Sequence, residues 1–125
     1  MRLSGDKARV ILGCIRLANG ALALVAPRML LQRLGSTAPD DAAAIHGLRM
    51  FGIRTVVIGA ELLVLSDGPQ RRQATRVAVL IHATDTWSAA TLGLRRQLPL
   101  PAAAAAILIS ATNTALALTA ALDQD

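Results

Sequence analysis

The segment from Ile45 to Leu65 constrains the fold most, because it is long enough to span a bilayer yet carries three charges. A helix rises about 1.5 Å per residue, so roughly 20 residues cross a hydrocarbon core of about 30 Å. The charges belong to Arg49, Arg54 and Glu61. A charge near the centre of a bilayer costs at least about 2.5–3.5 kcal/mol and needs a polar partner. We therefore expect other apolar segments to enclose this one and to supply those partners.

Three further apolar segments are separated from it by proline, glycine and aspartate. Hydrophobic residues make up 54% of the chain and charged residues 17%, against roughly 45–50% and about 25% in soluble domains. The sequence therefore predicts an all-α fold, a single domain of residues 1–125 arranged as a four-helix, up-and-down transmembrane bundle. Asp40 or Asp41 is expected to cap the second helix. The predicted helices cover about residues 8–26, 45–65, 76–94 and 102–122.

Polar residues recur near the middle of each predicted helix. When the helices are threaded up and down, one polar residue from each falls at the same depth, and Glu61 and His82 lie toward one side of that layer. We expect Arg16 and Arg54 to pair with Asp85 and Glu61, since charges in lipid are seldom left unpaired. The predicted buried polar network consists of Arg16, Arg54, Glu61, His82, Asp85 and Asn113.

Small residues mark the faces where helices are expected to approach closely. Gly20 follows Arg16 by four residues, so both lie on one stripe of the first helix. Gly52 and Gly59 are seven residues apart and lie nearly opposite Arg54 on the second helix. We expect Gly20, Gly52 and Gly59 to serve helix packing. The faces of Gly52 and Gly59, or the alanine-rich faces, are also candidate contacts for a homodimer or another membrane protein.

The sequence lacks the residues that several classes of function require. The net charge is +5, but the arginines are scattered among apolar runs without a basic stripe or zinc-finger spacing, so nucleic acid is not an expected partner. His82 and Asp85, with Glu61 nearby, make a poor cation site beside two arginines. No triad spacing, phosphate loop or metal motif is present, so we expect no metal and no cofactor, and the pattern favours a function other than catalysis without deciding the question.

Basic residues at the predicted helix ends favour the lipid bilayer as partner and indicate an orientation. The apolar run after Lys7 is interrupted by Arg16 and Asn19, which favours a retained first helix over a cleaved signal peptide. The more basic side predicts that both termini are cytoplasmic, in a bacterial cytoplasmic membrane. That side holds Arg2, Lys7, Arg9, Arg71, Arg72 and Arg76, against Arg28, Arg33, Arg95 and Arg96, with Arg49 nearby, on the other.

Most of the chain resembles a family of small four-helix membrane proteins of unknown function, common in actinobacteria and distantly similar to the DoxX-like group. Members often carry an acid directly after the second arginine and another early in the third helix, where this chain has Thr55 and His82. The resemblance implies a four-helix membrane fold and no specific reaction. It rests on Ala26-Pro27-Arg28, on Arg49-Met-Phe-Gly52-Ile-Arg54 with Gly59 seven residues after Gly52, and on the Asp85 segment.

Four hypotheses about function follow from these patterns. The first is a structural or partner-binding membrane protein held together by its buried charges. The second is a small carrier or channel that uses the same layer for an anion or for protons. The third is a membrane enzyme acting on a lipid-soluble substrate, with Asp85 or Glu61 as acid or base. The fourth is a soluble helical bundle whose arginines reach the surface.

Overall fold

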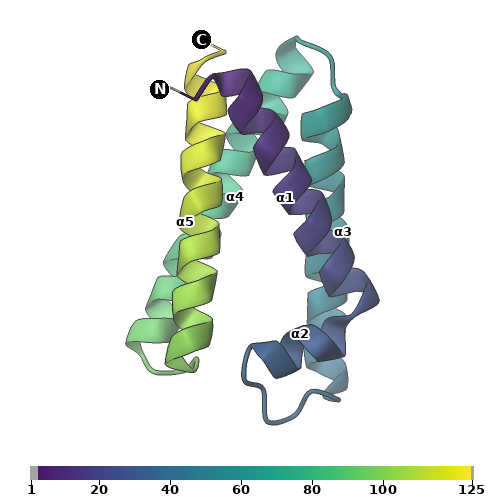
Figure 1. Ribbon diagram of the computed structural model, residues 1–125, viewed down its shortest axis with the longest axis vertical. Coiled ribbons are helices and arrows are strands. Elements are labelled where there is room, and N and C mark those ends of the chain that lie inside the picture. The colour runs from purple at the N-terminus through teal and green to yellow at the C-terminus, as the bar shows by residue number, and fades with distance from the viewer. Residues whose placement is uncertain (1–2, 125) are drawn as a thin grey trace.

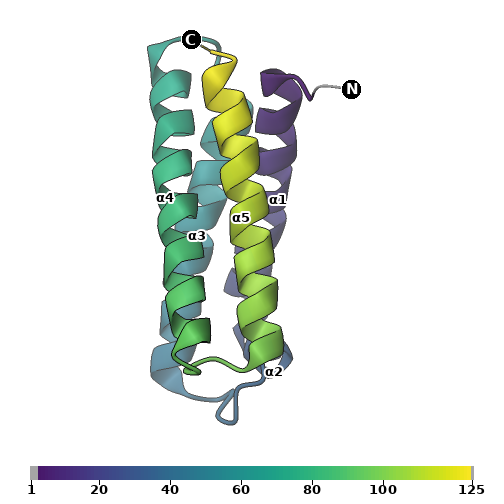
Figure 2. The same cartoon turned by 90° about the vertical axis from the view of Figure 1, so that its left-hand side faces the viewer.

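The computed structural model describes residues 3–124, and every regular element within them is a helix. This confirms the prediction of an all-α fold. Four long helices run along the long axis of the molecule, and one short helix lies at the end opposite the two termini (Figure 1, Figure 2). The helices are α1 (Gly5–Val25), α2 (Pro27–Arg33), α3 (Ala42–Val64), α4 (Pro69–Leu94) and α5 (Leu100–Leu122).

Local sequence signals explain where the helices start. The side chain of Asp41 accepts a hydrogen bond from the Ala44 amide at 2.7 Å, so Asp41 is the residue that caps α3. The largest difference from the sequence prediction is at α4, which begins at Pro69 rather than near residue 76. Proline suits the first turn of a helix, and the glutamine, arginine and alanine residues that follow are good helix formers. A prediction that follows hydropathy alone leaves out these first turns of α4, because their residues are polar.

The long helices form two antiparallel pairs, α1 with α3 and α4 with α5. The pairs meet at the end of the molecule that holds both termini and diverge toward α2 (Figure 1). α1 contacts both α3 and α5, so α1 rather than α3 is the central helix, contrary to the sequence expectation. The hydrophobic core lies in the closed half, where all four long helices contribute to it. Its buried members are Leu12, Ile58, Leu62, Ala78 and Ala117.

Glycines bring α1 and α3 into close contact. A Cβ atom added to Gly52 would lie 2.8 Å from the Gly20 carbonyl oxygen, and one added to Gly59 would lie 2.9 Å from that of Gly13. Both are closer than carbon and oxygen normally approach, so a side chain there would push the helices apart. α1 therefore covers Gly52 and Gly59 within the chain. This face, one of the homodimer contacts expected from the sequence, is thus already in contact with α1, and the homodimer itself stays a prediction.

We expect Gly52→Ala to destabilise the protein by about 1–3 kcal/mol, since its methyl group would meet backbone atoms of α1. Gly47→Ala on the same helix is the matched control. A Cβ at Gly47 has no neighbour within 4 Å, so alanine should stabilise the helix there by up to about 1 kcal/mol. Denaturant unfolding of both variants in detergent measures the difference. Equal stability changes would contradict the close packing of α1 on α3.

A polar cluster fastens the closed end of the molecule. The Gly5 amide donates to Asp123 Oδ2 at 2.6 Å, which joins the start of α1 to the residue after α5. Arg9 is buried and donates to the Leu62 carbonyl of α3 and to Asp6. These contacts join three helices where the pairs converge. Arg2, which the sequence places on this side, lies outside the described residues.

Candidate functional site

A layer of polar residues crosses the middle of the molecule, just beyond the hydrophobic core. Arg16 of α1, His82 of α4 and Asn113 of α5 are each at most 2% exposed. Nη1 of Arg16 lies 3.4 Å from Nδ1 of His82, and Nη2 of Arg54 lies 3.7 Å from Oδ1 of Asp85. The first contact is a long hydrogen bond, and the second is an ion pair without hydrogen-bond geometry. The structure thus brings together residues from all four long helices.

Phe51 stands beside both arginines of this layer. Its ring centre lies 6.0 Å from the Arg16 guanidinium carbon and 5.7 Å from that of Arg54. These distances are at the outer limit for a favourable interaction between a cation and a ring. Phe51 is the only phenylalanine in the chain and precedes Arg54 by three residues, a spacing that places both on neighbouring helix positions. This spacing is the sequence signal that could have identified Phe51 as a neighbour of Arg54.

Three of the predicted network residues are not buried. Glu61 is exposed and borders a shallow surface hollow with Gln70 and Gln73 of α4, so its predicted place in the buried network is wrong. Arg54 has 49% of its side chain exposed, and its partner Asp85 has 28%. Arg54 and Glu61 lie on a face of α3 that α4 contacts only in part. The charge layer is therefore open on one side.

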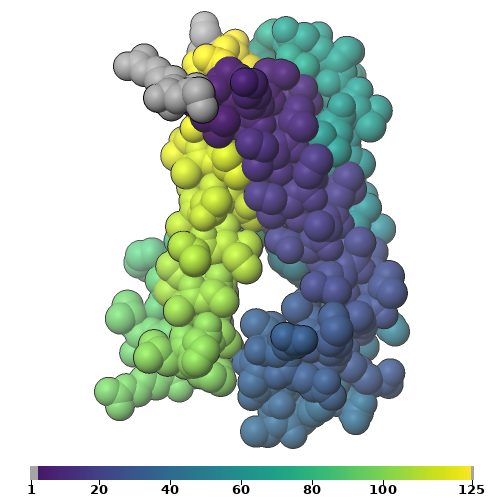
Figure 3. Space-filling view, viewed as in Figure 1, coloured from purple at the N-terminus to yellow at the C-terminus, as the bar shows by residue number. Residues whose placement is uncertain are grey.

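A cavity of about 360 Å³ lies between the two helix pairs on the α2 side of the polar layer. Figure 3 shows the molecule hollowed between the lower half of α5 and the segment around α2. Arg16, Asp85 and Asn113 line the cavity at its inner end. Leucine and alanine side chains make up most of the remaining wall. They include Leu22, Leu30, Leu34, Leu48, Leu92, Leu98, Ala105 and Ala106.

Several buried polar atoms around the inner end have no hydrogen-bond partner. They include Nε and Nη2 of Arg16, Oδ1 of Asn113 and Nε2 of His82. Thr55 Oγ1 on α3 is also buried and unpaired. A buried polar atom without a partner costs roughly 1–3 kcal/mol, and more when the group is charged. Groups of this kind beside a cavity are suited to receive polar atoms of a bound molecule.

The sequence prediction missed Arg9 and Gly13, although a signal for both was present. Arg9 precedes Arg16 by seven residues, and Gly13 precedes Gly20 by seven. Residues seven apart share a helix face, so the inward stripe of α1 extends to both. The sequence analysis places Arg9 among the basic residues at the membrane surface. The structure instead buries it against α3.

In the described part of the chain, no three side chains of His, Cys, Asp or Glu lie close enough together to hold a metal ion. Comparison with models of protein families, with curated proteins and with solved structures found no match to this chain. The resemblance to the DoxX-like group therefore stays a prediction.

Proposed function

We propose that this chain is a small integral membrane protein that binds a lipid-soluble molecule in the cavity between its two helix pairs. The observation that carries the proposal is the cavity itself, with its apolar wall and its unpaired buried polar atoms at one end. Small-molecule sites are typically apolar cavities of roughly 300–1,000 Å³ with a few converging polar groups. A purely structural charge layer has no need of such a space.

The distribution of apolar surface supports a location in the membrane. α1 and α5 are long and apolar enough to cross a bilayer. Only 17% of the most apolar window of α5 is buried in the molecule, whereas the core helix of a soluble protein is largely buried. Large apolar side chains are exposed along α5, among them Leu100, Leu108, Leu118 and Leu122. Lipid is the medium in which such a surface is stable.

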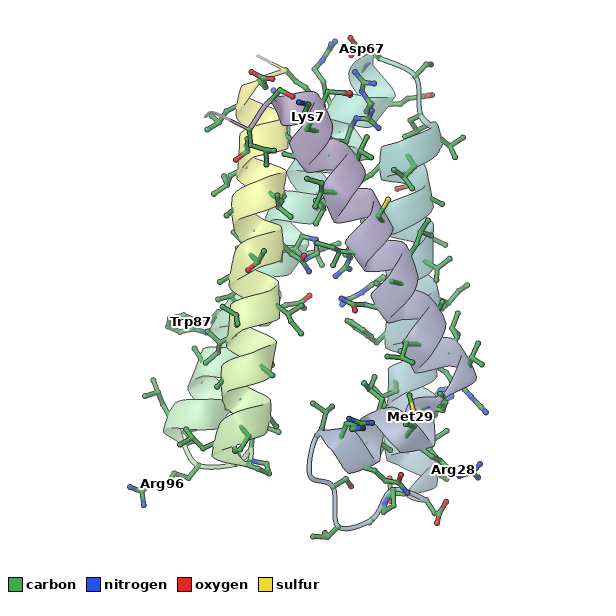
Figure 4. All side chains as sticks on the ribbon, viewed as in Figure 1. Lys7, Arg28, Met29, Asp67, Trp87 and Arg96 are labelled. Carbon is green, nitrogen blue, oxygen red and sulfur yellow. The ribbon has the colours of Figure 1, made fainter. Side chains whose placement is uncertain are left out.

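The position of the charges at the helix ends also fits a bilayer. Lys7 and Asp67 lie at one end of the molecule, and Arg28 and Arg96 lie at the other (Figure 4). Trp87 projects outward from the side between these ends (Figure 4) and is 75% exposed. Lysine and arginine near both ends of the spans can contact lipid phosphates. We retain the proposed orientation with both termini in the cytoplasm.

A charge on the outer face of α5 tests the membrane location. We expect Leu108→Arg to reduce the amount of protein inserted into membranes severely, since an arginine inside a bilayer costs at least about 2.5–3.5 kcal/mol. Leu122→Arg, at the end of α5, is the matched control, because the two leucines are similarly exposed, at 69% and 73%. Alkaline extraction of membranes followed by immunoblotting measures insertion. Equal tolerance of both variants, or wild-type protein in the supernatant, would contradict the proposal.

Saturable binding of a lipid-soluble probe tests the ligand site. Decanol, which is neutral and apolar along most of its length, should bind the purified protein with one molecule per chain. Non-saturating uptake, equal to that of empty detergent micelles, would contradict a ligand site in the cavity. If the protein is a carrier, as the second hypothesis from the sequence holds, it should both bind the probe and move it across liposome membranes.

A second candidate is a homodimer through the outer face of α5. Its small residues Ala104, Ala111 and Ala115 are exposed along that face, and such residues permit close helix approach in lipid. No helix of the same chain covers this face, whereas α1 covers the face of Gly52 and Gly59. Crosslinking in native membranes tests this candidate, since a dimer through α5 should be captured by a cysteine placed at Ala111 and lost when Ala115→Leu is added to that cysteine variant.

A further inference from the structure

We propose that the ligand of this cavity is a single-chain amphiphile with one negative charge, whose carboxylate binds Arg16 and whose apolar chain extends toward α2. This inference rests on the proposed function and specifies its ligand. Three independent features of the site support it: the charge balance of the polar layer, the hydrogen-bonding edge that Arg16 leaves free, and the shape of the cavity wall.

The polar layer lacks one negative charge. It contains two arginines, Arg16 and Arg54, and a single carboxylate, Asp85, which lies at ion-pair distance from Arg54. His82 accepts from Arg16 through Nδ1, so its ring is neutral and supplies no charge. Among residues 3–124, Arg16 thus has no carboxylate at ion-pair distance, and the one carboxylate that acts on it, Asp85, is shared with Arg54. The other acids described lie near the helix ends or on exposed surface: Asp6, Asp40, Asp41, Glu61, Asp67 and Asp123.

The free edge of Arg16 matches a carboxylate. Its Nη1 is engaged by His82, whereas Nε and Nη2 are buried and unpaired. In a guanidinium group, the N–H bonds of Nε and Nη2 are parallel and lie on one edge, the pattern that binds both oxygens of a carboxylate. Asn113, which lines the same end, can donate a further hydrogen bond through its amide. Asp85 also lines this end, and Arg54 offsets its charge.

The wall of the cavity fits one apolar chain. Along α5 the lining extends from Asn113 to Ala105, which corresponds to roughly 12 Å at 1.5 Å per residue. Beyond the polar end the wall consists mostly of leucine, isoleucine and alanine. The volume of about 360 Å³ is near the lower end of the range for small-molecule sites. A single chain with a small head group therefore suits the space better than a two-chain phospholipid.

Equilibrium binding of radiolabelled decanoate to the purified protein in a non-ionic detergent tests the head group. Decanol has the same chain without the charge, and decyltrimethylammonium has the opposite charge. We expect decanoate to bind about tenfold or more tightly than decanol, the effect of hydrogen bonds to a charged group, and the ammonium compound not to compete. Acetate and inorganic phosphate, which lack a chain, should not compete either. Tighter competition by phosphatidylglycerol than by decanoate would overturn the single-chain ligand.

Charge variants separate this inference from a structural role of the arginines. Arg16→Gln should weaken decanoate binding about tenfold or more and leave decanol binding unchanged. Arg54→Gln leaves Asp85 to neutralise Arg16, so decanoate should again bind weakly. The double variant Arg54→Gln with Asp85→Asn restores one uncompensated positive charge and should recover decanoate binding. Arg49→Gln is the control, because Arg49 is exposed and does not line the cavity.

The outcomes distinguish the two proposals. Equal binding of decanol and decanoate to wild-type protein would overturn the anionic ligand and leave the proposed function standing. Absence of saturable binding by both probes would overturn both proposals. Failure of the double variant to recover decanoate binding, when its decanol binding is intact, would also overturn the charge-balance argument.

Discussion

Replacing Arg16 with methionine is expected to stabilise the protein while weakening its binding of decanoate. The guanidinium group of Arg16 is buried, two of its nitrogens have no partner, and its contact with His82 Nδ1 is a long one at 3.4 Å, so little is lost with it. Methionine is unbranched and fills irregular space without a charge. Replacing buried charges with apolar groups of similar size often stabilises proteins by about 1–4 kcal/mol. A gain in stability together with a loss of binding would show that Arg16 serves the ligand rather than the fold.

Arg9→Met provides a control on the same face of α1, seven residues before Arg16. Arg9 is also buried, but it donates to the Leu62 carbonyl and to Asp6. Its loss leaves the Leu62 carbonyl without this donor, so we expect Arg9→Met to be destabilising. The change in unfolding free energy, measured with denaturant in detergent, should therefore have opposite signs for Arg16→Met and Arg9→Met. Destabilisation by both variants would assign Arg16 the structural role that the sequence analysis put first.

The depth of the polar layer was predictable from the sequence, because it depends on local geometry. Prolines, glycines and caps fix where helices end, and a constant rise per residue then places Arg16, Asp85 and Asn113 at similar depths. The structure brings these three residues to one end of the cavity. The contact between α1 and α3 also had a signal, since each helix carries two glycines seven residues apart.

The divergence of the helix pairs was not predictable in this way. Glu61 and Arg54 share a face of α3, but whether that face meets α4 depends on the angle between the pairs. That angle depends on tertiary contacts between the pairs, such as the hydrogen bond from Gly5 to Asp123 at the closed end. The sequence therefore predicted that Arg16 and Arg54 pair with Asp85 and Glu61 in a buried layer. The structure instead exposes Glu61, which leaves two arginines and one carboxylate in the layer, and the proposed anionic ligand follows from that difference.

Filling the cavity is expected to abolish binding of both decanoate and decanol without unfolding the protein. Ala106 lines the cavity and is partly exposed to it, so Ala106→Trp places a large ring where the ligand chain would lie. The cavity of about 360 Å³ provides space for this ring between the helix pairs. The apolar ring also buries against leucines, so we expect an unchanged or raised unfolding midpoint.

Ala104→Trp is the matched control for this variant, since Ala104 lies on the same helix but is exposed and outside the cavity lining. It should bind both probes like the wild type. The comparison separates occupancy of the cavity from adsorption to the apolar exterior, because α5 presents leucines on its outer face. Exterior adsorption would survive in both variants. Binding that persists in Ala106→Trp at wild-type strength would therefore contradict a ligand site between the helix pairs.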